Sequence, residues 1–193
     1  MADLKTDVKI LGKVQELLAS GGLGAVSFDA IARELGISKQ AVLYWFPSKG
    51  DLLAAMFVDW LGAEAHVAEA SLESADTANE AVEVFVRAIT RFHMGDLDRF
   101  RMMYLAPQTL KTDVQEAKNA KALERIHATT SRMYGALAAR LDGTLEQSRQ
   151  SAFTIHSAAL GLVMMLGLSE GIGDPLKHSK DDLVNALIAN LTA

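Results

Sequence analysis

The sequence predicts an all-α protein of about nine helices, and three observations carry this prediction. The alternation of polar and apolar residues with a period of two, which is typical of half-buried strands, is missing. Serine or threonine followed three residues later by an acid or an amide recurs along the chain, as is common at helix starts. Proline occurs only at positions 47, 107 and 175, and each position is a predicted helix boundary.

The helices can be placed in order along the chain. We expect them at roughly 4–20, 27–34, 38–44, 48–70, 78–94, 96–106, 113–141, 146–170 and 180–191. The expected capping boxes are Thr77 with Glu80, Thr112 with Gln115, Thr144 with Gln147, and Ser179 with Asp182. At 193 residues the chain can hold one large or two small domains. We expect two, over 1–62 and 63–193, with the boundary inside the long fourth helix.

The most informative segment is 27–46, whose spacing suits a helix-turn-helix. Ile31, Ala32 and Leu35 lie on one face of the first helix, and Ala32 is small enough for a second helix to pack closely against it. Gly36 stands at the turn, where a residue with positive φ is needed.

The second helix of this segment has a good N-cap in Ser38. Its buried face is predicted to consist of Ile37, Val42 and Phe46, which leaves Ser38, Lys39, Gln40 and Tyr44 facing outward. A short helix that presents such residues can enter the major groove of DNA. The pattern alone also fits an αα-hairpin without a DNA-binding role.

The segment that follows, Leu43-Tyr44-Trp45-Phe46-Pro47-Ser48-Lys49-Gly50-Asp51-Leu52-Leu53, resembles the signature of the TetR family of bacterial transcriptional regulators. The resemblance extends over about residues 4–62. It implies an N-terminal helix-turn-helix domain, a C-terminal effector-binding and dimerisation domain, and no enzymatic activity. The DNA-binding positions that it implies are Ser27, Ser38, Lys39, Gln40, Ala41, Tyr44, Trp45 and Lys49.

At the start of the next predicted helix, Ser48, Lys49 and Asp51 have a role that the residues themselves indicate. Ser48 can cap the helix that begins at Lys49, with Asp51 three residues later as in a capping box. The free N–H groups of that helix start, together with Lys49, would form a phosphate clamp. Lys39, Gln40 and Tyr44 are the candidates for contacts with base edges.

Charge and composition restrict the possible functions. The net charge is −5, and residues 1–60 carry six basic and seven acidic side chains, a net charge of −1. A protein that coats nucleic acid would need many phosphate contacts, so this balance argues against such a role. The chain has no cysteine, and its first residues lack the features of a signal peptide, which favours a cytoplasmic location.

The most hydrophobic stretch, 153–168, is predicted to be a buried helix rather than a membrane span, because about 16 residues is too short and it includes polar side chains. A helix that is apolar all round in so small a chain needs a partner on one side. We therefore predict a homodimer in which two helices of each subunit meet; the alternative is ordinary core packing. The interface residues would be Ala158, Gly161, Met165, Leu168, Leu183, Leu187 and Leu191.

A second apolar set, rich in methionine and aromatic residues, is a candidate for a small-molecule site, although plain core packing is the more ordinary explanation of each residue. As an effector site it would use Phe85, Phe92, His93, Met102, Met103, Tyr104, Phe153, His156 and Met164, with a small apolar or aromatic ligand. No metal, cofactor or catalytic motif is indicated. Glu64, Glu69 and Glu73 are expected on a solvated helix face.

The sequence thus favours a homodimeric repressor that binds a palindromic site in double-stranded DNA and is released by an effector. The alternative is an all-helical ligand-binding or interaction protein without operator binding. The weak local positive charge is the only support for that alternative.

Overall fold

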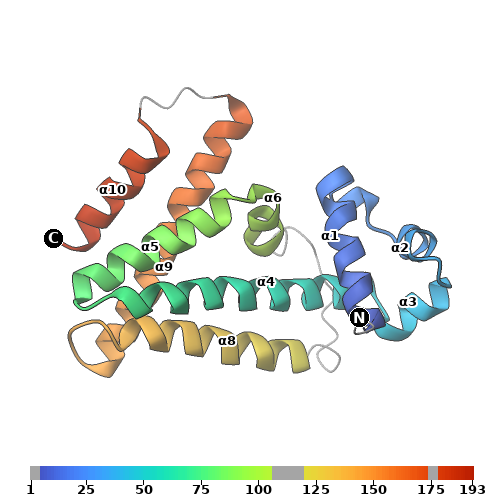
Figure 1. The fold of residues 1–193 in the computed structure, drawn as a ribbon, viewed down its shortest axis with the longest axis horizontal. Helices are drawn as coiled ribbons and strands as arrows, with labels where there is room; N and C mark the ends of the chain where they lie inside the picture. Colours follow the sequence, from blue (N-terminus) through green and yellow to red (C-terminus); the bar gives the residue numbers. More distant parts are fainter. Residues whose placement is uncertain (1–4, 106–119, 174–177) are drawn as a thin grey trace. The chain divides into compact units, whose positions relative to one another are not determined.

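The computed structural model describes residues 5–105, 120–173 and 178–193. These residues form α-helices, one short 3-10 segment and one short π-helical segment, and none of them lies in a strand. The predicted all-α class is therefore confirmed. Figure 1 shows the order of the helices along the chain.

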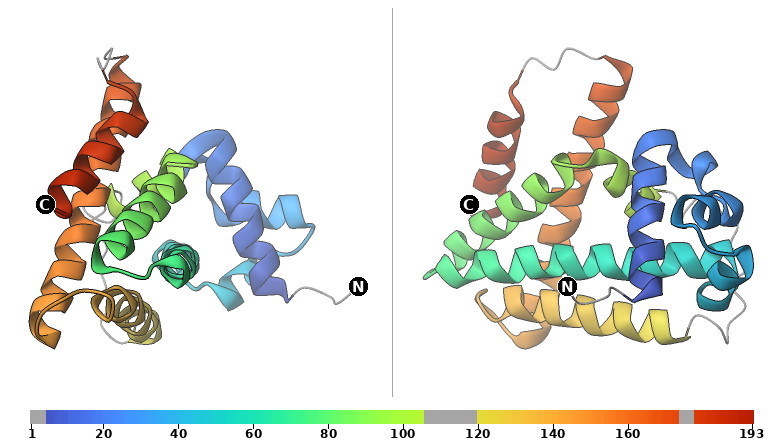
Figure 2. Two further views of the ribbon diagram at one scale, coloured as in Figure 1. Left: turned by 60° about the vertical axis from the view of Figure 1, so that its left-hand side comes forward. Right: turned by 45° about the vertical axis from the view of Figure 1, so that its right-hand side comes forward.

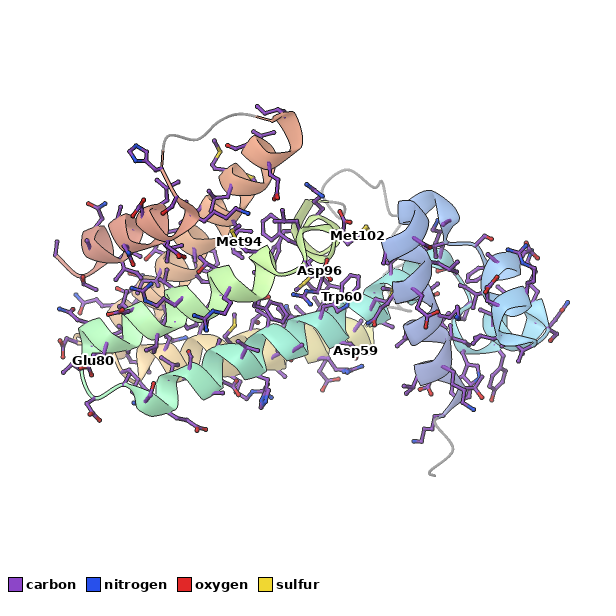
Figure 3. The ribbon with its side chains drawn as sticks, turned by 45° about the horizontal axis from the view of Figure 1, so that its top comes forward. Asp59, Trp60, Glu80, Met94, Asp96 and Met102 are labelled. Atoms are coloured by element: carbon purple, nitrogen blue, oxygen red, sulfur yellow. The ribbon has the colours of Figure 1, made fainter. Side chains whose placement is uncertain are left out.

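The chain folds into two compact units. The division falls between Asp59 and Trp60 on α4 (Lys49–Ser71), and both residues are labelled in Figure 3. The start of α8 (Ala120–Ala138), up to Glu124, is grouped with the first unit, and the rest of the described chain belongs to the second.

The first unit contains α1 (Thr6–Ala25), α2 (Phe28–Leu35), α3 (Lys39–Trp45) and the beginning of α4. α1 was expected to end near residue 20; helical structure instead extends to Ala25, across a kink at Gly22, where φ is 63°. A positive φ is accessible to glycine at little cost, so the chain can turn there without ending the element. The core of this unit is formed by apolar side chains from all four helices: Ile10, Val14, Ile31, Val42, Phe46, Leu52 and Met56.

The turn between α2 and α3 has the predicted geometry. Gly36 adopts the left-handed conformation, with φ 66° and ψ 31°, and its N–H and that of Ile37 donate to the carbonyl groups at the end of α2. Ile31 and Val42 are fully buried and Ala32 is nearly so, which lets the two short helices pack closely. Ile37 was expected on the buried face and is only half-buried.

The second unit contains the rest of α4, η1 (Leu72–Ser74), α5 (Ala78–Met94), α6 (Leu97–Phe100), the π segment η2 (Arg101–Leu105), most of α8, α9 (Leu145–Ile172) and α10 (Lys180–Leu191). α5 packs against α9, and α10 packs against both (Figures 1 and 2). The core of this unit, to which α4 and α8 also contribute, is built from small and aliphatic side chains around Phe85, Ile89, Met133 and Leu137.

Three of the four predicted capping boxes are present, at the starts of α5, α9 and α10. In each, the Ser or Thr hydroxyl accepts from the N–H three residues on, and the side chain there accepts from the capping residue's N–H. The box predicted at Thr112 and Gln115, and the start of the helix predicted at residue 113, lie outside the described residues. The helix predicted over 96–106 is a single α-helical turn followed by η2.

Gly36→Ala should lower the free energy of unfolding by about 1 kcal/mol or more, because a Cβ is strained at this positive φ. Gly12→Ala is the matched control: Gly12 lies inside α1, and a Cβ there meets nothing within 4 Å. It should raise stability by about 0.5–1 kcal/mol. Urea unfolding measures both, and equal effects of the two changes would contradict the role given to Gly36.

Candidate functional site

The start of α3 presents polar side chains to solvent. Ser38 caps the helix, its Oγ accepting from the N–H of Ala41 at 3.1 Å, and Lys39 and Gln40 follow on the exposed surface. Tyr44 is 80% exposed and Trp45 42% exposed, and their rings meet edge to face. Such exposure is unusual for large aromatic side chains and marks a surface suited to a partner.

Ser27 stands at the start of α2 and caps it in the same way, with its Oγ 3.1 Å from the N–H of Ala30. Asp29, in the first turn of α2, forms an ion pair with Lys39 at 2.9 Å. Both side chains are substantially exposed, so water weakens this pair and it can open. A base contact by Lys39 would require that opening.

The start of α4 has the predicted cap in a modified form. The Oγ of Ser48 accepts from the N–H of Asp51 at 3.1 Å, while the Ser48 hydroxyl donates to the Asp51 carboxylate at 2.7 Å. The ammonium group of Lys49 donates to the carbonyl oxygen of Val26 at 2.9 Å. An ammonium has three N–H donors, so this bond is compatible with an added phosphate contact.

The second unit contains a buried polar cluster that the sequence analysis missed. Glu64 was expected on a solvated face, and this was wrong: its side chain is 0% exposed. Its Oε1 lies 3.0 Å from Nε2 of His93 and 2.8 Å from Nε2 of His156, and its Oε2 accepts from the Tyr104 hydroxyl at 2.7 Å. The Tyr134 hydroxyl lies 2.9 Å from Nδ1 of His156. These five residues are called the Glu64 centre below.

The position of Glu64 follows from spacing along α4. Leu61, Ala65, Ala68 and Leu72 are buried on one stripe of the helix, and Glu64 falls on that stripe, three residues after Leu61 and four before Ala68. Residues three and four apart share a helix face, so the position of Glu64 relative to these apolar residues could have predicted its burial. Of the other two glutamates, Glu69 pairs with Arg132 and Glu73 is exposed as expected.

Burial and hydrogen bonding act in opposite directions on Glu64. Burial alone would raise the pKa of its carboxyl, but hydrogen bonds from His156 and His93, together with Coulombic attraction to the same two residues, outweigh it and lower the pKa from 4.5 to about 2. Burial, with the nearby Glu64 charge, raises the pKa of Tyr134 to about 12 and that of Tyr104 further above its ordinary value. The carboxylate is therefore ionised at neutral pH, and both phenols keep their protons.

The structure brings together part of the predicted effector set. Phe85, His93, Met103 and His156 are buried, and Phe92, Met102 and Tyr104 are half-buried. Tyr104 and Met102 lie on the π segment η2, which follows the short helix that begins after Asp96 (Figure 3). π segments are often found at functional sites.

Phe153 and Met164, also predicted to line this set, do not point inward: they are 56% and 43% exposed. The inward side of α9 carries Ile155, His156, Ala159, Val163 and Leu166 instead. Phe153 and Met164 join an outward apolar surface, called the α9 face below, which also contains Gly161, Met165, Leu168 and Ile172. Phe153, Met165, Leu168 and Ile172 are each more than half exposed.

The remaining predicted interface residues are less exposed. Ala158 and Gly161 are half-buried on α9, as are Leu183, Leu187 and Leu191 on α10. Leu187 and Leu191 pack against the core of their own unit, beside the buried Val184 and Ile188. A Cβ at Gly161 would meet nothing within 4 Å.

α9 contains the apolar stretch 153–168, which was predicted to be a buried helix rather than a membrane span. The apolar stretch was judged too short to span a bilayer, but the helix that contains it has 28 residues and a mean hydropathy of 1.6 in its most apolar window. By length and composition it is able to cross a membrane, so the length argument was wrong. A core helix of a soluble protein passes the same test, and one such helix is weak evidence. Among the described residues, no group of three His, Cys, Asp or Glu side chains is placed to hold a metal ion.

Comparison with known proteins identifies the first unit. Residues 10–56 match the family model described as bacterial regulatory proteins, tetR family. This match places the N-terminal part of the chain, residues 10–56, in the TetR family. The match supports a DNA-binding regulator rather than an enzyme, and the matched residues include the helix-turn-helix and the start of α4. None of the curated proteins matches this chain.

Solved structures share the fold over nearly the whole chain. A transcriptional regulator of the TetR/AcrR family from Thermobifida fusca is 21% identical, with a TM-score of 0.67 over 96% of each chain. The regulator FadR from Bacillus subtilis, in complex with stearoyl-CoA, is 16% identical, with a TM-score of 0.68 over 96% of this chain and 97% of its own. FadR from Bacillus halodurans, a fatty acid degradation regulator, is 13% identical, with a TM-score of 0.68 over 100% of this chain and 97% of its own.

The lowered pKa of Glu64 predicts how stability depends on pH. Because the folded-state value is below the unfolded one, the stabilisation is fully present above about pH 4.5 and is lost as pH falls towards about 2. Thermal unfolding of the wild type should therefore shift to lower temperature over this range. The Glu64→Gln variant, whose residue 64 cannot ionise, should show a smaller decrease in unfolding temperature over the same pH range. Parallel pH profiles of the two proteins would show that Glu64 is not ionised in the folded state.

Proposed function

We propose that this TetR-family chain is a homodimeric, cytoplasmic repressor that binds a palindromic operator and is released by a small-molecule effector. In this proposal residues 1–62 read DNA, and residues 63–193 bind the effector and form the dimer. Each subunit places α3 in the major groove, with the two helices roughly 34 Å apart, one turn of the duplex.

The observation that supports DNA reading most strongly is the exposed surface at the start of α3. Ser38, Lys39 and Gln40 are solvent-exposed and stand directly after the Gly36 turn, with Ala41 on the next position of the same helix. Four further residues of the same unit lie at the ends of helices and are suited to contacts with the sugar-phosphate backbone. They are Ser27 before α2, Tyr44 and Trp45 at the end of α3, and Lys49 at the start of α4.

Homodimerisation is supported by the α9 face. Exposed Phe153, Met165, Leu168 and Ile172 form an apolar surface on one helix, and such surfaces are typical of subunit contacts. Gly161 at its middle permits close approach of a second helix. A palindromic operator also requires two symmetry-related reading heads.

Effector binding is supported by the Glu64 centre and the aromatic and methionine side chains around it. A structurally similar regulator, FadR from Bacillus subtilis, has been crystallised with stearoyl-CoA. A ligand that prefers the state unable to bind DNA weakens operator binding by the same factor by which DNA weakens ligand binding.

A second candidate is an all-helical ligand-binding protein that does not bind an operator. The acidic balance of residues 1–60 and the pairing of Lys39 with Asp29 favour it. Selection of binding sites from random double-stranded DNA separates the two functions. Enrichment of a palindrome supports the repressor, whereas the absence of any enriched sequence at low salt supports the alternative.

Gln40→Ala should weaken binding to the selected operator by about 1–3 kcal/mol and relax the preference at one base pair in each half-site. Gln40 is exposed in the first turn of α3, where a side chain reaches base edges. Fluorescence anisotropy with operator variants measures this effect. Equal losses on operator and unrelated DNA would remove Gln40 from the base-reading set.

Lys49→Ala provides the comparison, because we propose that Lys49, at the start of α4, contacts phosphate rather than bases. It should weaken binding to operator and unrelated DNA alike and reduce the salt slope by about one unit. A change of base preference with an unchanged salt slope would contradict the phosphate assignment.

Gly161→Glu should dissociate the dimer while the subunit stays folded. A Cβ at Gly161 meets nothing within 4 Å in the subunit, but two symmetry-related carboxylates would be buried together at the interface. Sedimentation should show half the wild-type mass, with loss of operator binding and unchanged helicity. Gly135→Glu, at an equally open position on α8, is the matched control and should remain dimeric. If Gly161→Glu stays dimeric, the interface lies elsewhere.

A further inference from the structure

An ion pair joins α2 to α3 on the surface predicted to read DNA. Oδ2 of Asp29, in the first turn of α2, lies 2.9 Å from Nζ of Lys39, the first residue of α3. The two residues are ten positions apart, and the turn at Gly36 brings them together. Both side chains stay substantially exposed, at 71% for Asp29 and 48% for Lys39. The carboxylate therefore occupies the ammonium group of a residue that is a candidate for contacts with base edges.

The fold of this unit does not depend on the Asp29 carboxylate. The Ser27 hydroxyl already caps α2 by accepting from the N–H of Ala30. Buried Ile31 and Val42 hold α2 against α3. An acid in the first turn of an exposed helix adds only a small favourable interaction with the helix dipole, and an exposed ion pair adds little more. Loss of the Asp29 charge should therefore leave the unit folded, so the effect of the pair is to be sought in DNA binding.

Asp29 offers Lys39 the same chemistry as a DNA phosphate. Both are oxyanions that accept hydrogen bonds from the ammonium group. When Lys39 leaves the carboxylate for DNA, the ion pair is lost and an unpaired negative charge remains beside a polyanion. Both effects weaken binding to any duplex. Residues 1–60 carry only six basic side chains, so the retention of one of them by an internal acid removes a substantial part of their attraction for phosphate.

The magnitudes decide whether Lys39 can still reach DNA. An exposed ion pair favours the paired state by up to about fivefold. A well-placed contact of a lysine with O6 and N7 of guanine favours the bound state by roughly 5- to 150-fold. A correctly placed guanine therefore displaces Asp29 from Lys39. The ion pair lowers the affinity of the complex but does not prevent it.

We propose that Asp29 is an autoinhibitory residue, which competes with DNA for Lys39 and so lowers the affinity for the operator. The proposal rests on the operator-binding function given above. Lys39 contacts DNA only after its ion pair with Asp29 opens, so the operator complex is weaker than the exposed side chains of α3 alone would make it. A weaker complex needs a smaller difference in effector affinity between the two states for its release.

Asp29→Asn removes the charge and keeps a side chain of nearly the same size. Fluorescence anisotropy with the selected operator should show binding about two- to fivefold tighter than that of the wild type. Glu34→Gln is the matched control, because it also removes one negative charge from α2, and the ion pair of Glu34 is with its neighbour Arg33. This control should change the affinity little. Asp29→Ser should give the same gain as Asp29→Asn, so the result does not depend on the folding of one variant.

The same substitution in a Lys39→Met background separates competition for Lys39 from general repulsion between Asp29 and phosphates. Without an ammonium group to release, Asp29→Asn should have a much smaller effect, so the two substitutions are coupled. An equal gain with and without Lys39 would show that Asp29 acts as a charge alone. Weaker operator binding by Asp29→Asn would show that Asp29 orients Lys39 for its contact. Either result would overturn the proposal.

Failure of the autoinhibition is distinguishable from failure of the proposed function. If the wild type binds a selected operator and Asp29→Asn binds it no more tightly, Asp29 is not autoinhibitory and the repressor function stands. If neither protein binds any duplex at low salt, while both keep the helical content of the wild type, the proposed function fails and the competition for Lys39 fails with it.

Discussion

The second unit is organised around one buried charge. Glu64 is fully enclosed, so its carboxylate must be hydrogen-bonded from within the protein, and the donors come from three different elements: α5, η2 and α9. Each donor has to be held within about 3 Å of the carboxylate, so the elements that carry them cannot shift independently. A ligand that altered these bonds would therefore change the packing of several helices at once.

The first unit depends on local backbone chemistry instead. Gly36, in the left-handed conformation, ends α2. The hydroxyl groups of Ser38 and Ser48 then cap the first turns of α3 and α4, each by accepting from an N–H three residues later. These short-range bonds, together with buried Ile31 and Val42, are sufficient to hold a seven-residue helix that would not be stable alone. The polar residues at the start of α3 are left exposed, which suits the major-groove contacts of a TetR-type regulator.

The two units differ in how far they could be predicted. Caps and turns are set by neighbouring residues, so the helix-turn-helix and the capping boxes at Thr77, Thr144 and Ser179 were recognisable in the sequence. The Glu64 centre joins residues up to 92 positions apart, and no local pattern requires a carboxylate there. Its place on the apolar stripe of α4 was visible, but the charge favoured a surface position. On α9, apolar residues surround the whole helix, so sequence alone could not separate inward His156 from outward Phe153.

The position of the protons on the two imidazoles tests the central claim, an ionised Glu64 held by hydrogen-bond donors from three elements, most directly. Nitrogen chemical shifts of the histidine side chains, recorded by NMR at pH 7, distinguish the two neutral tautomers from the imidazolium ion. The structure predicts that both imidazoles carry a proton on Nε2, which donates to the Glu64 carboxylate. A proton on Nδ1 alone at either residue would contradict this arrangement, because Nε2 could not then donate to Glu64.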